Sequence, residues 1–147
     1  MADIWETLCT RAKEHYHPQE LSPFFESNHV VAAIEAADGS IYTGFCIEGA
    51  SGVLNLCAER VAAINMIANS GQTVVRRIVA FRDSYPFRDG HFLPCGACRE
   101  FFMQLSAENT DAEILTDYAS RETVRLGDLL PLWWGDERYE NNRKDTQ

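Results

Sequence analysis

The sequence predicts an α/β fold in which helices cover the faces of a mixed β-sheet of about five strands. Segments with helical spacing of apolar residues alternate with segments of strand-like composition, in the order helix, strand, strand, helix, strand, helix, strand, strand, helix. The 147 residues have the usual size of one domain, and 46% hydrophobic and 24% charged residues is a globular composition. We see neither an internal repeat nor a linker, so we expect a single domain over residues 1–147.

The first part of the chain predicts a helix followed by a β-hairpin. Apolar residues recur at helical spacing in residues 3–16, and the proline-containing stretch that follows indicates a connector. Residues 29–37 and 41–47 have strand-like composition and are separated by a tight Asp-Gly turn. We therefore expect two antiparallel strands here.

The middle of the chain predicts two helices with a strand between them. A loop at 49–56 precedes a helix at 57–69, and the strand follows at 74–81. A long loop at 82–93 then leads to a second helix at 95–106, whose start is favoured by the preceding proline. Long loops in compact domains often shape binding sites, so we expect this loop to lie near one.

The last part of the chain predicts two short strands and a short helix. The strands are expected at 113–116 and 123–126, and the helix at 127–130, where a proline ends it. Residues 136–147 are polar, and we expect them to form a frayed tail.

The overall charge and the cysteines limit the possible partners. A net charge of −9 would repel nucleic acids and anionic membranes, so we expect a small-molecule substrate, no nucleic acid and no membrane. No apolar stretch has the length of a membrane span or the pattern of a signal peptide, which favours a cytoplasmic location. Five cysteines are an odd number, which argues for metal binding or redox chemistry rather than a disulfide framework.

Two cysteine motifs open the second and third predicted helices. The first reads Cys-Ala-Glu at 57–59, and the second reads Pro-Cys-Gly-Ala-Cys at 94–98. The unpaired N–H groups and partial positive charge at a helix N-terminus favour the thiolates that zinc requires. Cys57, Cys95 and Cys98 therefore predict a Zn²⁺ site with three protein ligands and a fourth position left open, as in catalytic zinc sites.

Charged residues beside these cysteines predict further roles. Glu59 follows Cys57 by two residues, so it can stand near a water at the open position without binding the metal, and we predict that it transfers protons. Three thiolates overcompensate the zinc charge, and Arg60 could counter this by donating to the sulfurs; an ordinary salt bridge is an equally good interpretation. The same argument applies more weakly to Arg99, for which a salt bridge or a solvated position is favoured.

With these neighbouring arginines included, the two motifs resemble those of the cytidine deaminase family of zinc-dependent enzymes. The resemblance runs from about residue 28 to residue 131 and includes Ala-Ser at 50–51 and Leu-Leu-Pro at 129–131. A cysteine at position 57, where nucleic-acid editing members usually carry histidine, is similar to the branch that acts on free nucleosides.

The resemblance implies a fold, an activity and an assembly. The fold is a three-layer α/β/α sandwich, usually assembled as a homotetramer. The activity is hydrolytic deamination of cytidine or deoxycytidine, as in pyrimidine salvage, with release of ammonia and formation of the uridine-type product. By the same resemblance, Glu59 moves protons to the ring nitrogen and to the leaving amine.

The sequence departs from the family where the substrate is held. The resemblance assigns substrate contacts to Glu48, Cys46 and Ala58, but family members usually carry asparagine at the position of Cys46. A thiol is a poor hydrogen-bond partner, so Cys46 is more simply interpreted as a small apolar filler. The segment at 28–33 also lacks the family's usual Phe-Pro-x-Gly. These departures motivate an alternative substrate, a modified cytosine nucleoside or related aminated heterocycle of the blasticidin S kind.

Other interpretations of the same residues remain open. Cys95 and Cys98 could form a thioredoxin-like pair in a thiol–disulfide exchange protein, although this leaves Cys57 and Glu59 without a role. The three cysteines could also bind zinc in a module without turnover. The aromatic pair at 133–134 could cover a substrate site, but core or interface packing is the favoured interpretation.

Overall fold

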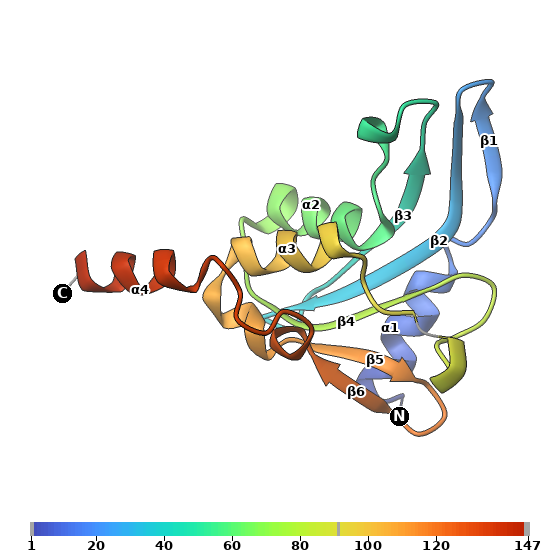
Figure 1. Cartoon of the computed structure of the whole chain (residues 1–147). Helices are drawn as coiled ribbons and strands as arrows, with labels where there is room; N and C mark the ends of the chain where they lie inside the picture. The colour runs from blue at the N-terminus through green and yellow to red at the C-terminus, as the bar shows by residue number, and fades with distance from the viewer. Residues whose placement is uncertain (1, 91, 146–147) are drawn as a thin grey trace.

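The computed structural model describes residues 2–90 and 92–145 and has the predicted α/β architecture (Figure 1). Ten helices and strands are described, together with four short 3-10 helices, η1 to η4. In chain order they are α1 (Ile4–Lys13), β1 (Gln19–Ser22), β2 (Phe25–Ala36), β3 (Ile41–Glu48), η1 (Gly52–Leu54), α2 (Ala58–Ser70), β4 (Val75–Phe81), η2 (Arg88–Gly90), α3 (Gly96–Leu105), η3 (Ala107–Asp111), β5 (Glu113–Asp117), β6 (Glu122–Arg125), η4 (Leu126–Leu129) and α4 (Asp136–Asp145).

The strands form one mixed sheet of six strands, one more than expected. Strand β2 pairs antiparallel with β3 along one edge and with both β1 and β4 along the other, since β1 meets its first half and β4 its second. Strands β4 and β5 are parallel, and β6 returns antiparallel to β5. The ends of β1, β2 and β3 project beyond the helices in Figure 1.

Helices cover both faces of the sheet, because residues of the central strands alternate between two apolar cores. Helix α1 covers one face, with a core that includes Leu8 of the helix and Val31 and Phe81 of the sheet. Helices α2 and α3 cover the other, where Met66 and Phe102 pack on the sheet. Within the described ranges, no helix combines the length and apolarity that a membrane span requires.

The approach of α2 to β3 is unusually close. A Cβ atom at Gly44 of β3 would lie 2.4 Å from the carbonyl oxygen of Ala58 and 2.5 Å from the backbone nitrogen of Ala62. The absence of a side chain therefore lets the first turn of α2 lie directly on the strand. At its other end, α2 stops at Gly71, whose φ of 71° is the left-handed conformation typical of a helix C-terminus.

Two elements differ from the sequence prediction. Strand β1 lies in the stretch that the sequence analysis interprets as a connector. The sequence does not predict this strand, because its residues are almost all exposed and show no apolar alternation. Residues 136–145 form helix α4 rather than a frayed tail, and Tyr139 on this helix donates a hydrogen bond to the carbonyl of Met103 at 2.6 Å. Residues 146–147 of the expected tail lie outside the described part of the chain.

The close approach at Gly44 predicts a large effect of adding a single methyl group. Gly44→Ala should lower the free energy of unfolding by about 3 kcal/mol, because the atoms it meets are backbone and cannot turn aside. Chemical denaturation measures the loss. Gly52→Ala is the matched control, since nothing lies within 4 Å of its Cβ position. Equal stabilities of the two variants would contradict the close packing.

Candidate functional site

The three predicted cysteine ligands converge at one point. Cys57 directly precedes α2, Cys95 directly precedes α3, and Cys98 lies in the first turn of α3. The Sγ atoms are 3.4 Å apart between Cys57 and Cys95 and 3.6 Å apart between Cys95 and Cys98. All three lie within 4.8 Å of one another, and the described residues contain no other such group of three or more metal-binding side chains.

This geometry and donor set fit a tetrahedral zinc ion. Zn–S bonds of about 2.3 Å at tetrahedral angles place sulfurs roughly 3.8 Å apart, which is close to the observed separations. Burial raises the pKa of the Cys98 thiol. Burial is also the main cause of the raised pKa of Cys57. Burial acts in the same sense at Cys95, but the backbone N–H of Cys98 and the neighbouring thiols outweigh it, so its pKa is lowered. Three sulfurs this close need a cation to remain thiolates together.

The two arginines of the motifs do different things. Arg60 donates from Nη2 to the Sγ of Cys57 at 3.4 Å, and its Nε is buried without a hydrogen-bond partner in the described part of the protein. This contact favours the interpretation in which Arg60 donates a hydrogen bond to a cysteine sulfur over that of an ordinary salt bridge. Arg99 instead donates to two carbonyl oxygens, that of Pro94 at 2.8 Å and that of Leu129 at 3.4 Å. Arg99 therefore links the start of α3 to η4. These two hydrogen bonds to carbonyl oxygens correspond neither to donation to the sulfurs nor to a salt bridge or a solvated position.

Glu59 lies in the first turn of α2 and is buried, with 6% of its surface exposed. Burial raises the pKa of its carboxyl above the ordinary value. It lines a cavity of about 260 Å³ together with Cys57 and Cys95. A buried carboxyl beside three sulfurs is suited to hold and transfer a proton.

The cavity also collects the predicted substrate residues. Glu48, Cys46 and Ala58 all line it, and its described lining residues include two carboxyl groups, those of Glu48 and Glu59, but no lysine, arginine or histidine. Most of the remaining wall is apolar. The full described lining is Val30, Cys46, Ile47, Glu48, Asn55, Leu56, Cys57, Ala58, Glu59, Ala80, Phe92, Leu93 and Cys95.

Several of these neighbours were missed by sequence reasoning. His29, which carried no signal of its own, places Nε2 3.0 Å from Oε1 of Glu48. Asn55 lines the cavity and accepts the backbone N–H of Gly49 at 2.7 Å. An isolated bridge between Ile47 and Leu56 brings this segment back along β3, and the glycine- and serine-containing loop at 49–56 has no strand-like pattern that predicts such a bridge.

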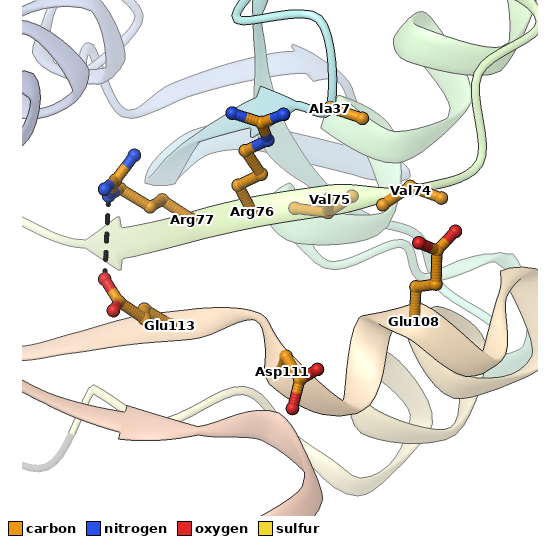
Figure 2. A pocket seen from close by; sticks show the side chains of 8 residues that line it. All are labelled: Ala37, Val74, Val75, Arg76, Arg77, Glu108, Asp111 and Glu113. Carbon is orange, nitrogen blue, oxygen red and sulfur yellow. Dashed lines mark ion pairs between the residues drawn. The ribbon is translucent and has the colours of Figure 1, made fainter.

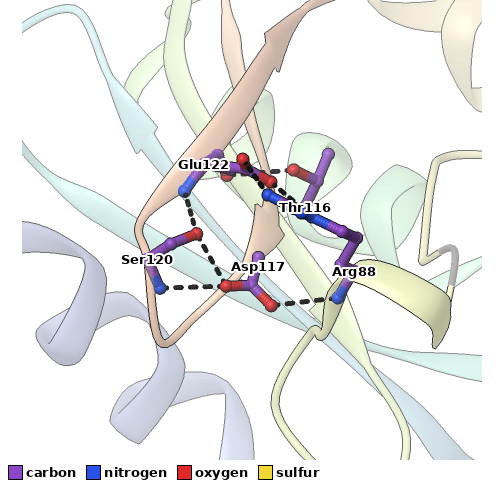
Figure 3. A network of polar contacts seen from close by, with 5 residues as sticks. All are labelled: Arg88, Thr116, Asp117, Ser120 and Glu122. Atoms are coloured by element: carbon purple, nitrogen blue, oxygen red, sulfur yellow. Dashed lines mark hydrogen bonds and ion pairs between the residues drawn. The ribbon is translucent and has the colours of Figure 1, made fainter.

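The loop between β4 and α3 contributes Phe92 and Leu93 to the cavity and is anchored near its middle, at Arg88 (Figure 3). The backbone N–H of Arg88 donates to Asp117 at 2.9 Å, and its side chain forms an ion pair with Glu122. Asp117 also accepts the backbone N–H of Ser120 at 2.9 Å. The turn between β5 and β6 thus fixes the part of the loop that precedes Phe92 and Leu93. Because these two residues line the cavity, the loop lies near the candidate site, as predicted.

A larger hollow of about 400 Å³ lies elsewhere, at the opposite end of β4 (Figure 2). Two of its charged lining residues, Arg77 and Glu113, pair with each other at 3.5 Å, and Arg77 also pairs with Glu35, outside the lining, at 2.6 Å. It contains neither cysteine nor histidine among its described lining residues. The chemistry of the smaller cavity makes that one the candidate active site.

The aromatic pair after η4 packs on α3 rather than on the cavity. Trp133 is buried in the core, and Trp134 is exposed. Both indole N–H groups donate to the carboxylate of Glu100, at 3.0 Å and 3.1 Å. Neither tryptophan lines the candidate site, so packing explains Trp133 and the Glu100 hydrogen bond explains the placement of Trp134.

Comparison with known proteins finds deaminases among the relatives of this chain. No protein-family model matches the chain. It is 31% identical over 118 residues to a cytidine deaminase of Mycobacterium tuberculosis (strain CDC 1551 / Oshkosh), which covers 78% of this chain and 79% of that protein. It is 34% identical over 121 residues to a blasticidin-S deaminase of Bacillus cereus, covering 78% and 84%. The crystal structure of a Mycobacterium tuberculosis cytidine deaminase matches with a TM-score of 0.65 and 28% identity, over 91% of this chain and 99% of that one.

The contact between Arg60 and Cys57 predicts weaker metal binding when the guanidinium is removed. Arg60→Met should lower zinc affinity by about ten- to a hundredfold, because a hydrogen bond that stabilises a ligand sulfur is lost. A competition titration against a chromophoric chelator measures the change. Arg76→Met, an exposed arginine on the distant hollow, should bind zinc as the unmodified protein does. Unchanged affinity in Arg60→Met would show that the contact does not support the metal.

Proposed function

The chain belongs to the cytidine deaminase family, since it is 31% identical to a member over 79% of that member's length, and from this premise we propose that it is a zinc-dependent hydrolase acting on cytidine or deoxycytidine. The products are ammonia and the uridine-type nucleoside. The observation that carries the proposal is the meeting of three cysteine sulfurs with buried Glu59 on one cavity.

Each part of the reaction is assigned to residues of this chain. Cys57, Cys95 and Cys98 would hold zinc, which supplies, when bound, the Lewis acidity that makes water a nucleophile near neutral pH. Glu59 takes a proton from the attacking water and delivers it to the ring nitrogen; it then takes a second proton from the hydroxyl that the water has added and delivers it to the leaving amine. Arg60 keeps negative charge from accumulating on the sulfurs by donating to Cys57.

The apolar part of the cavity suits a flat, neutral heterocycle, and Glu48 at its rim is proposed to accept a hydroxyl of the sugar. Ala58 leaves room beside Glu59, and Cys46 fills space rather than binding the substrate. Its sulfur supports that role, because it accepts the backbone N–H of Val30 at 3.2 Å.

A modified cytosine nucleoside is a second candidate substrate. Two observations favour it: Cys46 stands where relatives of the ordinary type carry a hydrogen-bonding amide, and a blasticidin-S deaminase is among the relatives. The chemistry at the cysteines is the same for both candidates. A thiol–disulfide function would use Cys95 and Cys98 alone and is disfavoured by the presence of Cys57 and Glu59 at the same point.

The proposed assembly and location extend beyond the single chain. We propose a homo-oligomer, a tetramer by family resemblance, which the exposed apolar side chains on the projecting segments support; Val53 on η1 is 92% exposed. We propose a cytoplasmic location, which agrees with the five free cysteines, because thiols persist in a reducing compartment.

Replacing the proton carrier should separate catalysis from metal binding. Glu59→Gln should retain one equivalent of zinc but lose turnover of cytidine by about a thousandfold, because the amide cannot deliver a proton. Ammonia release and the ultraviolet shift on deamination measure turnover, and atomic absorption measures zinc. Glu20→Gln, on exposed β1, is the control and should remain fully active. Full activity in zinc-loaded Glu59→Gln would refute the assignment.

The charges of the lining predict discrimination against phosphorylated substrates. Because the described lining contains Glu48 and Glu59 but no lysine, arginine or histidine, a phosphate on the sugar meets repulsion without a compensating cationic side chain. Cytidine 5′-monophosphate should show kcat/KM at least a hundredfold below that of cytidine. Steady-state kinetics on both compounds check this, with cytosine and blasticidin S included in the same panel. Comparable values for cytidine and its monophosphate would contradict the proposed binding mode.

A further inference from the structure

Strand β2 carries a pronounced irregularity beside the cavity. Ser27 pairs with Ile47 of β3, but the next pairing of the two strands joins Val31 with Phe45. Residues 28–30 therefore stand opposite Cys46 alone, which is two residues more than a regular ladder holds. Such a β-bulge redirects side chains, and bulges are frequent next to active sites.

The bulge is held by its own buried contacts. Asn28 has a φ of 64°, a left-handed conformation that asparagine tolerates better than most residues, and it is buried. Its side-chain Nδ2 donates to the carbonyl of His15 at 2.7 Å, and its Oδ1 accepts the hydroxyl of Ser27 at 2.6 Å. The backbone N–H of His17 donates to the carbonyl of Asn28 at 3.2 Å. None of these bonds involves the imidazole of His29.

The bulge places Val30 in the cavity lining and His29 beside Glu48, which also lines the cavity. Val30 joins its lining, and the N–H of Val30, displaced from the ladder, donates to the sulfur of Cys46. His29 meets Glu48, with Nε2 3.0 Å from Oε1. An ionised carboxylate only accepts hydrogen bonds, so Nε2 of His29 is the donor. Glu48 makes no other hydrogen bond or ion pair that the structure describes for its side chain, and this leaves its second oxygen for a ligand.

We propose that His29 is a positioning residue for the substrate: it holds one oxygen of Glu48 at the cavity rim so that the other accepts a sugar hydroxyl of the bound nucleoside. This inference rests on the proposed function. The side chain of Glu48 is 54% exposed at the end of a strand, and without a partner it would have to be ordered when the substrate binds. His29 orders it in advance, which strengthens binding.

The test separates this role from catalysis and from folding. His29→Phe keeps an aromatic ring but removes the donor, and His29→Gln keeps an N–H at similar reach. For cytidine, His29→Phe should raise KM five- to tenfold and change kcat less than twofold, and His29→Gln should restore most of the loss. For 2′,3′-dideoxycytidine, which lacks those hydroxyls, KM should be nearly the same in all three proteins. The preference for cytidine over the dideoxy compound therefore shrinks only in His29→Phe.

A second pair of variants tests whether the effect passes through Glu48. In a Glu48→Ala background, His29→Phe should have no further effect on KM. His17→Phe is the matched control, because His17 is exposed and contacts the bulge through its backbone N–H, and this variant should keep the kinetics of the unmodified protein. An unchanged KM in His29→Phe, an undiminished effect without Glu48, or a parallel loss of kcat and thermal stability would each overturn the inference.

Failure of the proposed function is distinguishable from failure of this inference. No turnover of cytidine by the zinc-loaded, unmodified protein would refute the function. Calorimetric titration with cytidine then decides the inference alone: it stands if His29→Phe binds five- to tenfold more weakly than the unmodified protein, and it fails if the two bind equally or neither binds.

Discussion

Helices α2 and α3 lie on the same face of the sheet and begin at the same end of it, and the site depends on this arrangement. Each helix start contributes cysteine sulfur, and the sulfurs of Cys57 and Cys95 meet at 3.4 Å because the two helices pack side by side on one face of the sheet. Gly44 sets how closely α2 can lie on β3. The cysteine cluster is thus built from two segments, 38 residues apart between Cys57 and Cys95, without any of its sulfurs coming from a loop interior.

Much of the fold and the reacting centre follows from the sequence because both rest on strong local patterns. The strand-like composition of β2 and β4 and the helical spacing in α2 and α3 are properties of single segments, and the cysteine motifs sit at helix starts where thiolates are favoured. The elements that could not be predicted carry no local apolar pattern. Strand β1 is exposed and gives no pattern, and the polar sequence of α4 carries no apolar face.

The rim of the cavity was the least predictable part of the site. Glu48, Cys46 and Ala58 were named from family resemblance, and the structure places all three on the cavity. The partners that give Glu48 and Cys46 their environments, His29 and Val30, come from the bulge in β2. Its position depends on how two strands register, and no propensity of residues 28–30 indicates a two-residue offset. Arg60 donates a hydrogen bond to a cysteine sulfur, whereas Arg99 donates to carbonyl oxygens. Only the structure distinguishes these two roles.

The bulge has a consequence for how this cavity can diverge between relatives. Side chains alternate faces with a period of two, so an insertion of two residues leaves every residue on either side of it facing the core it would face without the insertion. A homologue that lacks these two residues would keep both apolar cores and the cysteine cluster and would lose the rim contacts together with the buried hydrogen bonds that hold the bulge. Substrate choice can therefore evolve by gain or loss of a residue pair in β2 while the reacting centre is left intact.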